Sequence, residues 1–216
     1  MPSASLPSKV VCVGRNYAAH ARELGNAIPE QPILFLKPST SVCRMAEGVR
    51  WPSGQGSCHH EAELCVRLGS PLRQASPEQA LAAVREVTLG LDLTLRDLQD
   101  QLKARGHPWE RAKAFDGACV LGDWLGVDAV GDLRDVRFSL HVDGELRQQG
   151  HTADMLFGVA ALLSEISQTF SLLAGDVVMT GTPAGVAALQ PGQSLLLTLD
   201  TLLGDVQFHT TVIGAS

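Results

Sequence analysis

Two acidic residues one position apart, Glu61 and Glu63, are the first candidates for chemistry in this chain. They lie in the stretch "HHEAELCVRLG" (59–69), whose apolar residues alternate as in a β-strand. In that pattern both carboxylates point to the same face of the strand, where they would repel each other. A solvated strand face is the simplest interpretation and stays open, because acidic side chains are mostly exposed.

A third acid, Asp92, favours a different interpretation. It lies in "LGLDLTL" (89–95), where nearly every neighbour is apolar and a solvated position is hard to arrange. An unpaired carboxylate there would be costly to bury and would tend to take up a proton. A hard divalent cation would resolve both problems, since oxygen-only ligands favour Mg²⁺, Mn²⁺ or Ca²⁺. We therefore predict that Glu61, Glu63 and Asp92 bind such a cation.

A zinc site is a competing interpretation of the same region. The side chains that zinc prefers are offered by Cys58, His59, His60 and Cys65. Adjacent histidines on a strand point to opposite faces, however, and the usual paired-cysteine spacing is absent. The zinc interpretation is therefore the weaker of the two.

A histidine and a glutamate form a second candidate group in "GRNYAAHAREL" (14–24). His20 and Glu23 are three residues apart, so on a helix they share a face. A carboxylate beside an imidazole orients it and makes it a better base. An ordinary exposed ion pair is the alternative.

The glycine-rich stretch "TGTPAG" (180–185) follows no familiar phosphate-binding or nucleophile motif. It is either a plain turn or a loop that presents backbone N–H groups and the Thr182 hydroxyl to a small anion.

Short strands with few helices must position these residues. Strands are predicted over 9–14, 33–38, 60–68, 87–93, 176–180, 194–200 and 205–213, with a hairpin at Asp143-Gly144. Helices are predicted over 16–24, with Asn16 as N-cap, and over 76–87, 95–106 and about 154–169, while 44–57 is predicted to be a loop. This pattern predicts an α+β domain with an antiparallel or mixed sheet.

Composition narrows the class of protein. The 216 residues include 45% hydrophobic ones and carry a formal net charge of −6, which favours a single globular domain over 1–216 and argues against nucleic-acid binding. No Lys/Arg block suits an anionic membrane, and no apolar run is long enough for a membrane span. The apolar run within the first 14 residues is too short for a signal peptide. Five scattered cysteines do not resemble a disulfide framework, so we expect a cytoplasmic protein.

The motifs taken together are similar to those of the fumarylacetoacetate hydrolase family, closest to its small single-domain acylpyruvase-like branch. The resemblance runs from about Lys9 to Val212 and rests on "GRNYAAHAREL", "LFLKPST", "HHEAEL", "LDLTLRDLQ", "PWERAKAFD" and "GDVVMTGTPAGV". It implies an α+β fold of the family's mixed β-roll or β-sandwich type with few short helices, built as a homodimer.

The resemblance also implies roles for individual residues. The family's metal ligands fall on Glu61, Glu63 and Asp92, the three that the burial argument selects. Its catalytic pair falls on His20 and Glu23, and its lysine near the metal on Lys113. Its substrate-facing positions resemble Arg15, Asn16, Phe35, Lys37, Arg96, Gln99 and Thr182.

The activity implied is Mg²⁺-dependent hydrolysis of a C–C bond in an acylpyruvate or related 2,4-diketo acid, with His20 activating water and Mn²⁺ or Ca²⁺ as possible substitutes. The same metal and enolate chemistry also serves oxaloacetate decarboxylation or tautomerisation, and isomerisation of 2-hydroxyhepta-2,4-diene-1,7-dioate. These remain open alternatives, and the expected partner in each case is a small oxo acid. We further predict that residues 15–31 close over a bound ligand, because hydrolysis must exclude bulk water.

Overall fold

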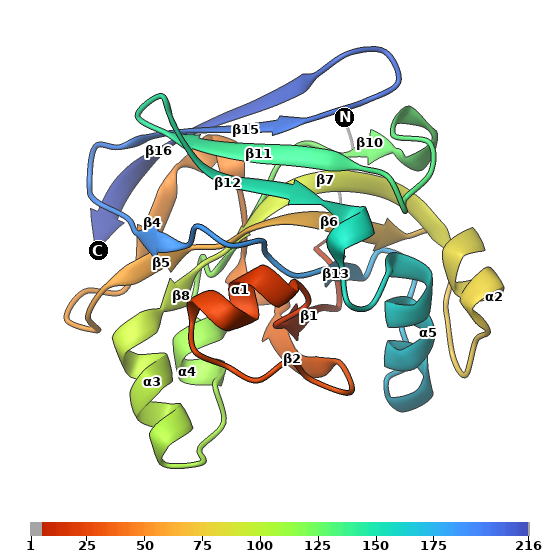
Figure 1. Ribbon diagram of the computed structural model, residues 1–216, viewed down its shortest axis with the longest axis horizontal. Coiled ribbons are helices and arrows are strands. Elements are labelled where there is room, and N and C mark those ends of the chain that lie inside the picture. Colours follow the sequence, from red (N-terminus) through yellow and green to blue (C-terminus); the bar gives the residue numbers. More distant parts are fainter. Residues whose placement is uncertain (1–5, 216) are drawn as a thin grey trace.

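The computed structural model describes residues 6–215 as short helices arranged around strongly curved sheets (Figure 1). The predicted α+β class is confirmed. Residues 1–5, which belong to the N-terminal segment considered above, and residue 216 lie outside the described part of the chain.

The largest sheet in residues 6–215 has eight strands and contains the predicted acidic residues. In spatial order its main path is β2 (Ile33–Pro38), β1 (Lys9–Gly14), β13 (Val177–Met179), β6 (Ala62–Leu68), β7 (Val84–Asp92), β9 (Cys119–Leu121) and β3 (Val42–Arg44), and β10 (Leu125–Gly126) pairs with β7. The central strands β6 and β7 pair antiparallel, with Glu63 opposite Gly90. Because both strands have neighbours on each side, their backbones are held firmly in register.

A second sheet packs across the first, and a third, small sheet lies beside them (Figure 1). The second sheet runs β12 (Glu145–His151), β11 (Arg137–Val142), β15 (Ser194–Leu199), β16 (Val206–Ala215) and β4 (Val49–Trp51). The small one runs β14 (Ala187–Ala188), β5 (Cys58–His60) and β8 (Thr94–Leu95). Asp143 and Gly144 join β11 to β12 with φ angles of 51° and 82°, as a two-residue hairpin turn requires, so the predicted hairpin is confirmed.

The alternation of β6 divides its side chains between two apolar clusters. Leu64 and Val66 belong to the larger cluster, which also contains Leu140 and Leu197 of the second sheet. Cys65 points the other way, into a smaller cluster on the opposite face. Both faces of β6 are therefore covered, and the solvated-face interpretation of the acidic pair is wrong.

The helices lie along the large sheet (Figure 1). They are α1 (Ala18–Glu23), α2 (Pro77–Ala82), α3 (Arg96–Ala104), α4 (Glu110–Lys113) and α5 (Val159–Thr169), with 3₁₀ turns at Ser39–Ser41, Met45–Glu47, Val127–Ala129 and Thr152–Asp154. Figure 1 places α3 and α4 on one side, the pair α2 and α5 on the other, and α1 between them. Among residues 6–215, no helix has the length and apolar character needed to cross a membrane.

Several predicted boundaries require correction. The helix predicted over 76–87 begins with a capping box at Ser76 but ends at Ala82, because residues from Val84 onward pair with β6 instead. The strand predicted over 60–68 is interrupted at Glu61, which separates β5 from β6. The predicted loop 44–57 contains β4, which pairs with β16. The helix predicted at about 154–169 begins only at Val159.

The predicted N-cap is also wrong. Helix α1 is preceded by Tyr17, and no side chain caps it. The Asn16 side chain instead accepts a hydrogen bond from the Phe157 N–H (2.8 Å) and donates to the carbonyl oxygens of Phe157 (3.0 Å) and Thr180 (2.8 Å). Asn16 thus ties the chain entering α1 to segments about 140 to 165 residues away in sequence.

Candidate metal centre and active site

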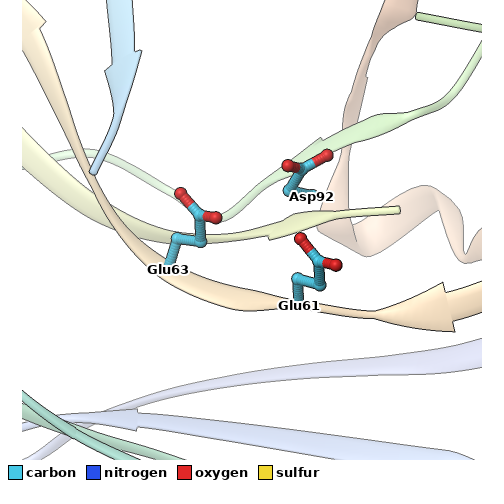
Figure 2. A group of neighbouring side chains, drawn as sticks. All are labelled: Glu61, Glu63 and Asp92. Atoms are coloured by element: carbon cyan, nitrogen blue, oxygen red, sulfur yellow. The ribbon is translucent and has the colours of Figure 1, made fainter. Parts of the chain in front are cut away.

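Three buried carboxylates converge at one end of the large sheet (Figure 2). One ligand atom from each of Glu61, Glu63 and Asp92 lies within 4.8 Å of the others, and the residues are only 5%, 1% and 1% exposed. Pairing of β6 with β7 creates this arrangement, and the Asp92 N–H donates to the Glu61 carbonyl oxygen at 2.8 Å. Two strands therefore hold the three acids together.

The zinc interpretation is wrong. Within residues 6–215, the acidic triad is the one group of three or more His, Cys, Asp or Glu side chains placed to hold a metal ion. Cys65 packs in the smaller apolar cluster, and the His60 Nδ1 bonds to the Gln148 side chain at 2.9 Å.

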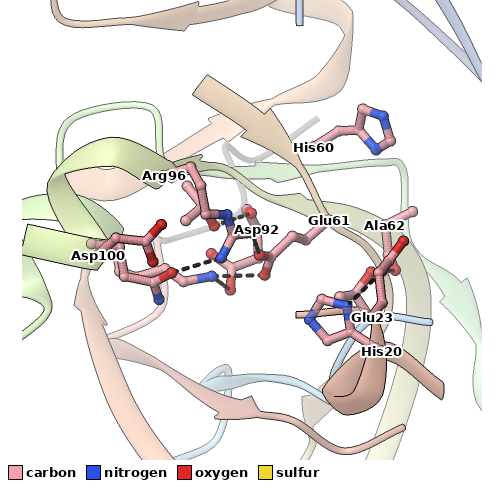
Figure 3. A network of polar contacts seen from close by, with 12 residues as sticks. His20, Glu23, His60, Glu61, Ala62, Asp92, Arg96 and Asp100 are labelled. Carbon is pink, nitrogen blue, oxygen red and sulfur yellow. Dashed lines mark hydrogen bonds and ion pairs between the residues drawn. The ribbon is translucent and has the colours of Figure 1, made fainter. Parts of the chain in front are cut away.

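Buried cations surround the acids and balance part of their charge (Figure 3). Lys113 Nζ lies 2.7 Å from Glu61 Oε2 and 2.7 Å from Asp92 Oδ2. Arg96 pairs with the other oxygen of Glu61, and Lys37 Nζ lies 2.7 Å from Asp92 Oδ1. Pairing of this kind is needed because isolated charges are expensive to bury.

Glu63 differs electrostatically from its neighbour Glu61. Burial would raise the pKa of Glu61, but Lys113 and Arg96 outweigh it and hold that pKa well below its usual value. At Glu63, burial and the nearby charges of Asp92 and Glu61 raise the pKa well above the usual range. The Gly181 N–H donates to Glu63 Oε2 at 2.7 Å, which only partly offsets this effect. Without a cation, Glu63 therefore favours its protonated form.

The donor set fits a hard divalent cation. All three groups are carboxylates, and Asp92 Oδ1 is buried yet accepts no well-formed hydrogen bond from residues 6–215. Lys37 is close enough to attract it electrostatically, but its ammonium donates to the carbonyl oxygens of Lys113 and Ala118 instead. A divalent cation would be coordinated by that oxygen and would remove the penalty of ionising Glu63.

The His20–Glu23 pair lies beside this centre and is not an ordinary exposed ion pair (Figure 3). His20 is only 5% exposed, and its Nδ1 lies 3.3 Å from Glu23 Oε2. The Gly185 N–H holds the same glutamate at 2.9 Å. Burial lowers the pKa of His20, more than Glu61 and Glu23 raise it, so the imidazole is neutral near pH 7. With Nδ1 as donor to Glu23, Nε2 is the nitrogen that can accept a proton.

The 180–185 loop uses its donors on the protein's own carboxylates and carbonyls. Its N–H groups at Gly181 and Gly185 donate to Glu63 and Glu23 respectively. A side chain at Gly181 (φ 101°) would place its Cβ 2.7 Å from the Asn16 Cβ, so glycine is required there. The Thr182 hydroxyl donates to the Ala62 carbonyl oxygen at 2.8 Å. The loop therefore positions the site as well as lining it.

Most of the predicted substrate-facing residues line one cleft with the acids. They are Arg15, Phe35, Arg96, Gln99 and Thr182, together with His20 and Lys113. Arg15 has a φ of 61°, unusual for a residue with a side chain, where the chain turns from β1 toward α1. Asn16 and Lys37 do not line the cleft: Asn16 fastens α1, and Lys37 lies fully buried beneath Asp92. Closure of residues 15–31 over a ligand stays a prediction.

Sequence reasoning missed two polar residues at this site. Gln148 of β12 is 1% exposed; it accepts from the Ala62 N–H at 2.9 Å and donates to the Thr182 hydroxyl at 2.7 Å. No local pattern marks it, because "RQQ" resembles an ordinary solvated strand. Lys103 also lines the cleft, and its helical spacing from Arg96 and Gln99 could have indicated this.

The family described as "Fumarylacetoacetate (FAA) hydrolase C-terminal" matches residues 9–210. The chain is 50% identical over 194 residues to the oxaloacetate tautomerase YcgM of Escherichia coli (strain K12), covering 89% of each protein. A crystal structure from Oleispira antarctica is 46% identical with a TM-score of 0.93, covering 99% of this chain and 96% of that one. The fumarylpyruvate hydrolase of Pseudomonas aeruginosa, crystallised with Mn²⁺ and pyruvate, is 39% identical with a TM-score of 0.86, covering 94% and 89%.

This chain therefore belongs to the fumarylacetoacetate hydrolase family of enzymes and has that family's mixed α+β fold. The acidic triad is suited to a divalent metal ion, and a structure similar to this one contains Mn²⁺.

Proposed function

We propose that this protein catalyses the keto–enol tautomerisation of oxaloacetate, with a divalent cation, Mg²⁺ or Mn²⁺, at Glu61, Glu63 and Asp92. The observation that carries the proposal is a buried, neutral histidine in the same cleft as the acidic triad. The choice of substrate is supported by the similarity to the Escherichia coli oxaloacetate tautomerase over 89% of both chains.

His20 would move the proton. In the keto form of oxaloacetate, a C–H bond at C3 breaks and an O–H bond forms at the C2 oxygen, so no atom is gained or lost. The imidazole can accept the carbon-bound proton at Nε2 and return a proton to the C2 oxygen, while Glu23 holds Nδ1–H and fixes the ring. The reverse transfer uses the same groups.

The remaining charges would stabilise the electron-rich oxygen that develops during proton transfer. A bound divalent cation would supply a Lewis acid for a 2-oxo acid. Lys113 stays protonated, since Asp92 and Glu61 outweigh burial and raise its pKa. Together with Arg96 it keeps buried positive charge in the wall of the cleft.

Hydrolysis of a C–C bond in an acylpyruvate is the second candidate. It is favoured by the similarity to the fumarylpyruvate hydrolase of Pseudomonas aeruginosa and by the His20–Glu23 pair, which could equally deprotonate a water molecule. The two reactions share the cleft and differ in whether the base acts on carbon or on water.

The test is to follow loss of the ultraviolet absorbance of enol-oxaloacetate with purified protein and Mg²⁺, against the protein-free rate. His20→Ala should slow the catalysed reaction by roughly 10²–10⁴-fold, the usual contribution of a positioned general base. His209→Ala, which changes an exposed histidine on the second sheet, should match the unaltered protein.

Acetylpyruvate and fumarylpyruvate assayed in parallel separate the two candidates. Rapid cleavage of either diketo acid, without acceleration of oxaloacetate tautomerisation, would replace the tautomerase assignment by the hydrolase one. Full tautomerase activity in His20→Ala would show that another group moves the proton.

A further inference from the structure

The cleft wall holds more positive charge than its carboxylates neutralise. Four cationic side chains, Arg15, Arg96, Lys103 and Lys113, line the cleft with the three acids of the metal centre, and a fifth, Lys37, lies buried beneath Asp92. Lys37, Arg96 and Lys113 each pair with Glu61 or Asp92. Arg15 and Lys103 pair with neither, and a bound divalent cation would add to the excess.

Neither of these two cations has a close anionic partner in the described chain. Arg15 forms no ion pair with residues 6–215. The carboxylate nearest to Lys103 is Asp100, whose Oδ1 lies 3.7 Å from Nζ and whose side chain is 63% exposed. Such an exposed, long pair is weak.

Helix α3 places Lys103 in line with the metal centre. Arg96, Gln99 and Lys103 are spaced three and four residues apart, share one face of the helix and line the same cleft. Arg96 bonds to Glu61 and to Gln99 (2.7 Å), so the row begins at the acids. A helix rises about 1.5 Å per residue, so the Lys103 backbone lies roughly 10 Å farther along the axis. Helical side chains tilt toward the N-terminus, which brings the ammonium back toward Gln99.

The surroundings of Lys103 favour an anion. Its side chain is 24% exposed, and Nζ lies 5.5 Å from the centre of the Trp109 ring, which also lines the cleft. Burial lowers the pKa of Lys103, and the charges of Arg96, Arg15 and Lys113 lower it further against the opposing effect of Asp100. A carboxylate placed here would relieve that repulsion.

We propose that Lys103, with Arg15, binds the second carboxylate of a four-carbon dicarboxylate, the one that lies away from the acidic triad. This inference rests on the proposed function and names the residues that would make the enzyme selective for dicarboxylates. The two carboxyl carbons of such a diacid are roughly 4 Å apart, given C–C bonds of about 1.5 Å, so the second carboxylate stays near the metal centre. The long Lys103 and Arg15 side chains, which line the same cleft as the acids, would reach toward it. Lys103 therefore selects dicarboxylates over 2-oxo acids of equal length with an apolar end.

The test compares oxaloacetate with 2-oxobutyrate, which carries a methyl group in place of the second carboxylate. With Mg²⁺ present, calorimetry should show tighter binding of oxaloacetate to the unaltered protein. Lys103→Met should weaken oxaloacetate binding and raise its KM by roughly ten- to hundredfold, the loss expected for a charge-assisted contact. Binding of 2-oxobutyrate should stay within about twofold, kcat should change little, and Lys103→Arg should restore most of the affinity.

Arg105→Met is the matched control, because it removes a neighbouring exposed positive charge outside the cleft. It should leave both ligands unaffected. Equal weakening of both ligands by Lys103→Met, or no loss with oxaloacetate, would overturn the inference.

Failure of this inference can be told apart from failure of the proposed function. If oxaloacetate is not tautomerised by the unaltered protein, the function fails, but the calorimetric preference still reports on the carboxylate subsite. If tautomerisation is rapid and the preference for oxaloacetate over 2-oxobutyrate is absent, only the subsite is wrong.

Discussion

Two buried carboxylate sites lie at opposite ends of the short strand β13. Before the strand, Asp176 accepts hydrogen bonds from the Ser8 N–H (3.1 Å) and hydroxyl (2.6 Å), the Lys9 ammonium (2.5 Å) and the Leu173 N–H (2.8 Å). After the strand, Gly181 donates to Glu63 in the acidic triad. Asp176 and Glu63 are equally hidden from solvent, at 0% and 1% exposed.

The carboxylate sites at the two ends of β13 differ in how completely their buried polar atoms are hydrogen-bonded. Both oxygens of Asp176 are engaged by several donors, and one cation balances its charge. In the metal centre, Arg96 Nε has no hydrogen-bond partner in residues 6–215, and Asp92 Oδ1 has only the ammonium of Lys37 as an ion-pair partner. The Tyr17 hydroxyl, His59 Nδ1 and His141 Nδ1 are also buried without a partner in this part of the chain. Buried polar groups in folded proteins are normally paired, so a cluster of unpaired ones marks where a ligand belongs. Burial alone would not separate the two sites.

The largest effect should follow from a substitution in the acidic triad, where polar atoms lack hydrogen-bond partners. Glu63→Gln removes one anionic ligand and should weaken Mg²⁺ and Mn²⁺ binding by roughly 10³-fold or more, with a comparable loss of activity, because a metal supplies several kcal/mol of charge stabilisation. The metal-free protein should keep its stability, since the raised pKa of Glu63 makes its carboxyl nearly neutral already. Calorimetric titration and thermal unfolding test both points. Unchanged metal affinity would remove Glu63 from the ligand set.

A substitution at Asp176, whose oxygens are fully hydrogen-bonded, should have the opposite effect: it should lower stability and leave metal binding unchanged. Asp176→Asn places an amide donor against several existing donors and should lower the free energy of unfolding by about 2–3 kcal/mol. Metal affinity should not change. Urea unfolding measures the loss, and Asp132→Asn is the control, because its partner Arg134 is 88% exposed and such surface pairs contribute little. A loss of metal binding in Asp176→Asn would show that the two ends are coupled.

Lowering the pH should remove the contribution of Asp176 to the stability of the protein. The hydrogen bonds from Lys9, Ser8 and Leu173 outweigh burial and lower the pKa of Asp176 below its usual 3.8. Its contribution to stability is therefore fully present above about pH 4 and is lost as the pH falls through the lower value of the folded state. Unfolding measured between pH 6 and roughly pH 3 should show a steeper loss in the unaltered protein than in Asp176→Asn. Parallel curves would contradict this assignment.

The smallest effect should come from Gln148, a fully hydrogen-bonded side chain that lies beside the metal centre. Gln148→Met keeps the volume but leaves the Ala62 N–H and the His60 ring without their acceptor. We expect a loss of about 1–2 kcal/mol in stability and roughly tenfold in metal affinity, because Ala62 lies between two ligands. The exposed neighbour supplies the control, Gln149→Met. Equal effects of the two substitutions would mean that Gln148 does not position the site.

Local sequence patterns determined the metal centre well. Alternation placed Glu61 and Glu63 on one face, and the apolar neighbours of Asp92 required it to be buried, as it is. The strands at 9–14 and 33–38 and the hairpin at Asp143-Gly144 were also predictable, because they depend on residues adjacent in the chain. The three-residue spacing of His20 and Glu23 identified that pair as a candidate, and the resemblance to a family supplied its catalytic role and Lys113.

Only the tertiary structure decided how these pieces are supported and satisfied. Asn16 resembles a helix cap, yet it bonds to Phe157 and Thr180, and the residues after Ala82 leave their helical pattern to pair with β6. Gln148 meets Ala62 across 86 positions because the second sheet packs over the first. A local pattern records the preferences of neighbouring residues, whereas hydrogen-bond satisfaction in a core depends on which distant strands are brought together.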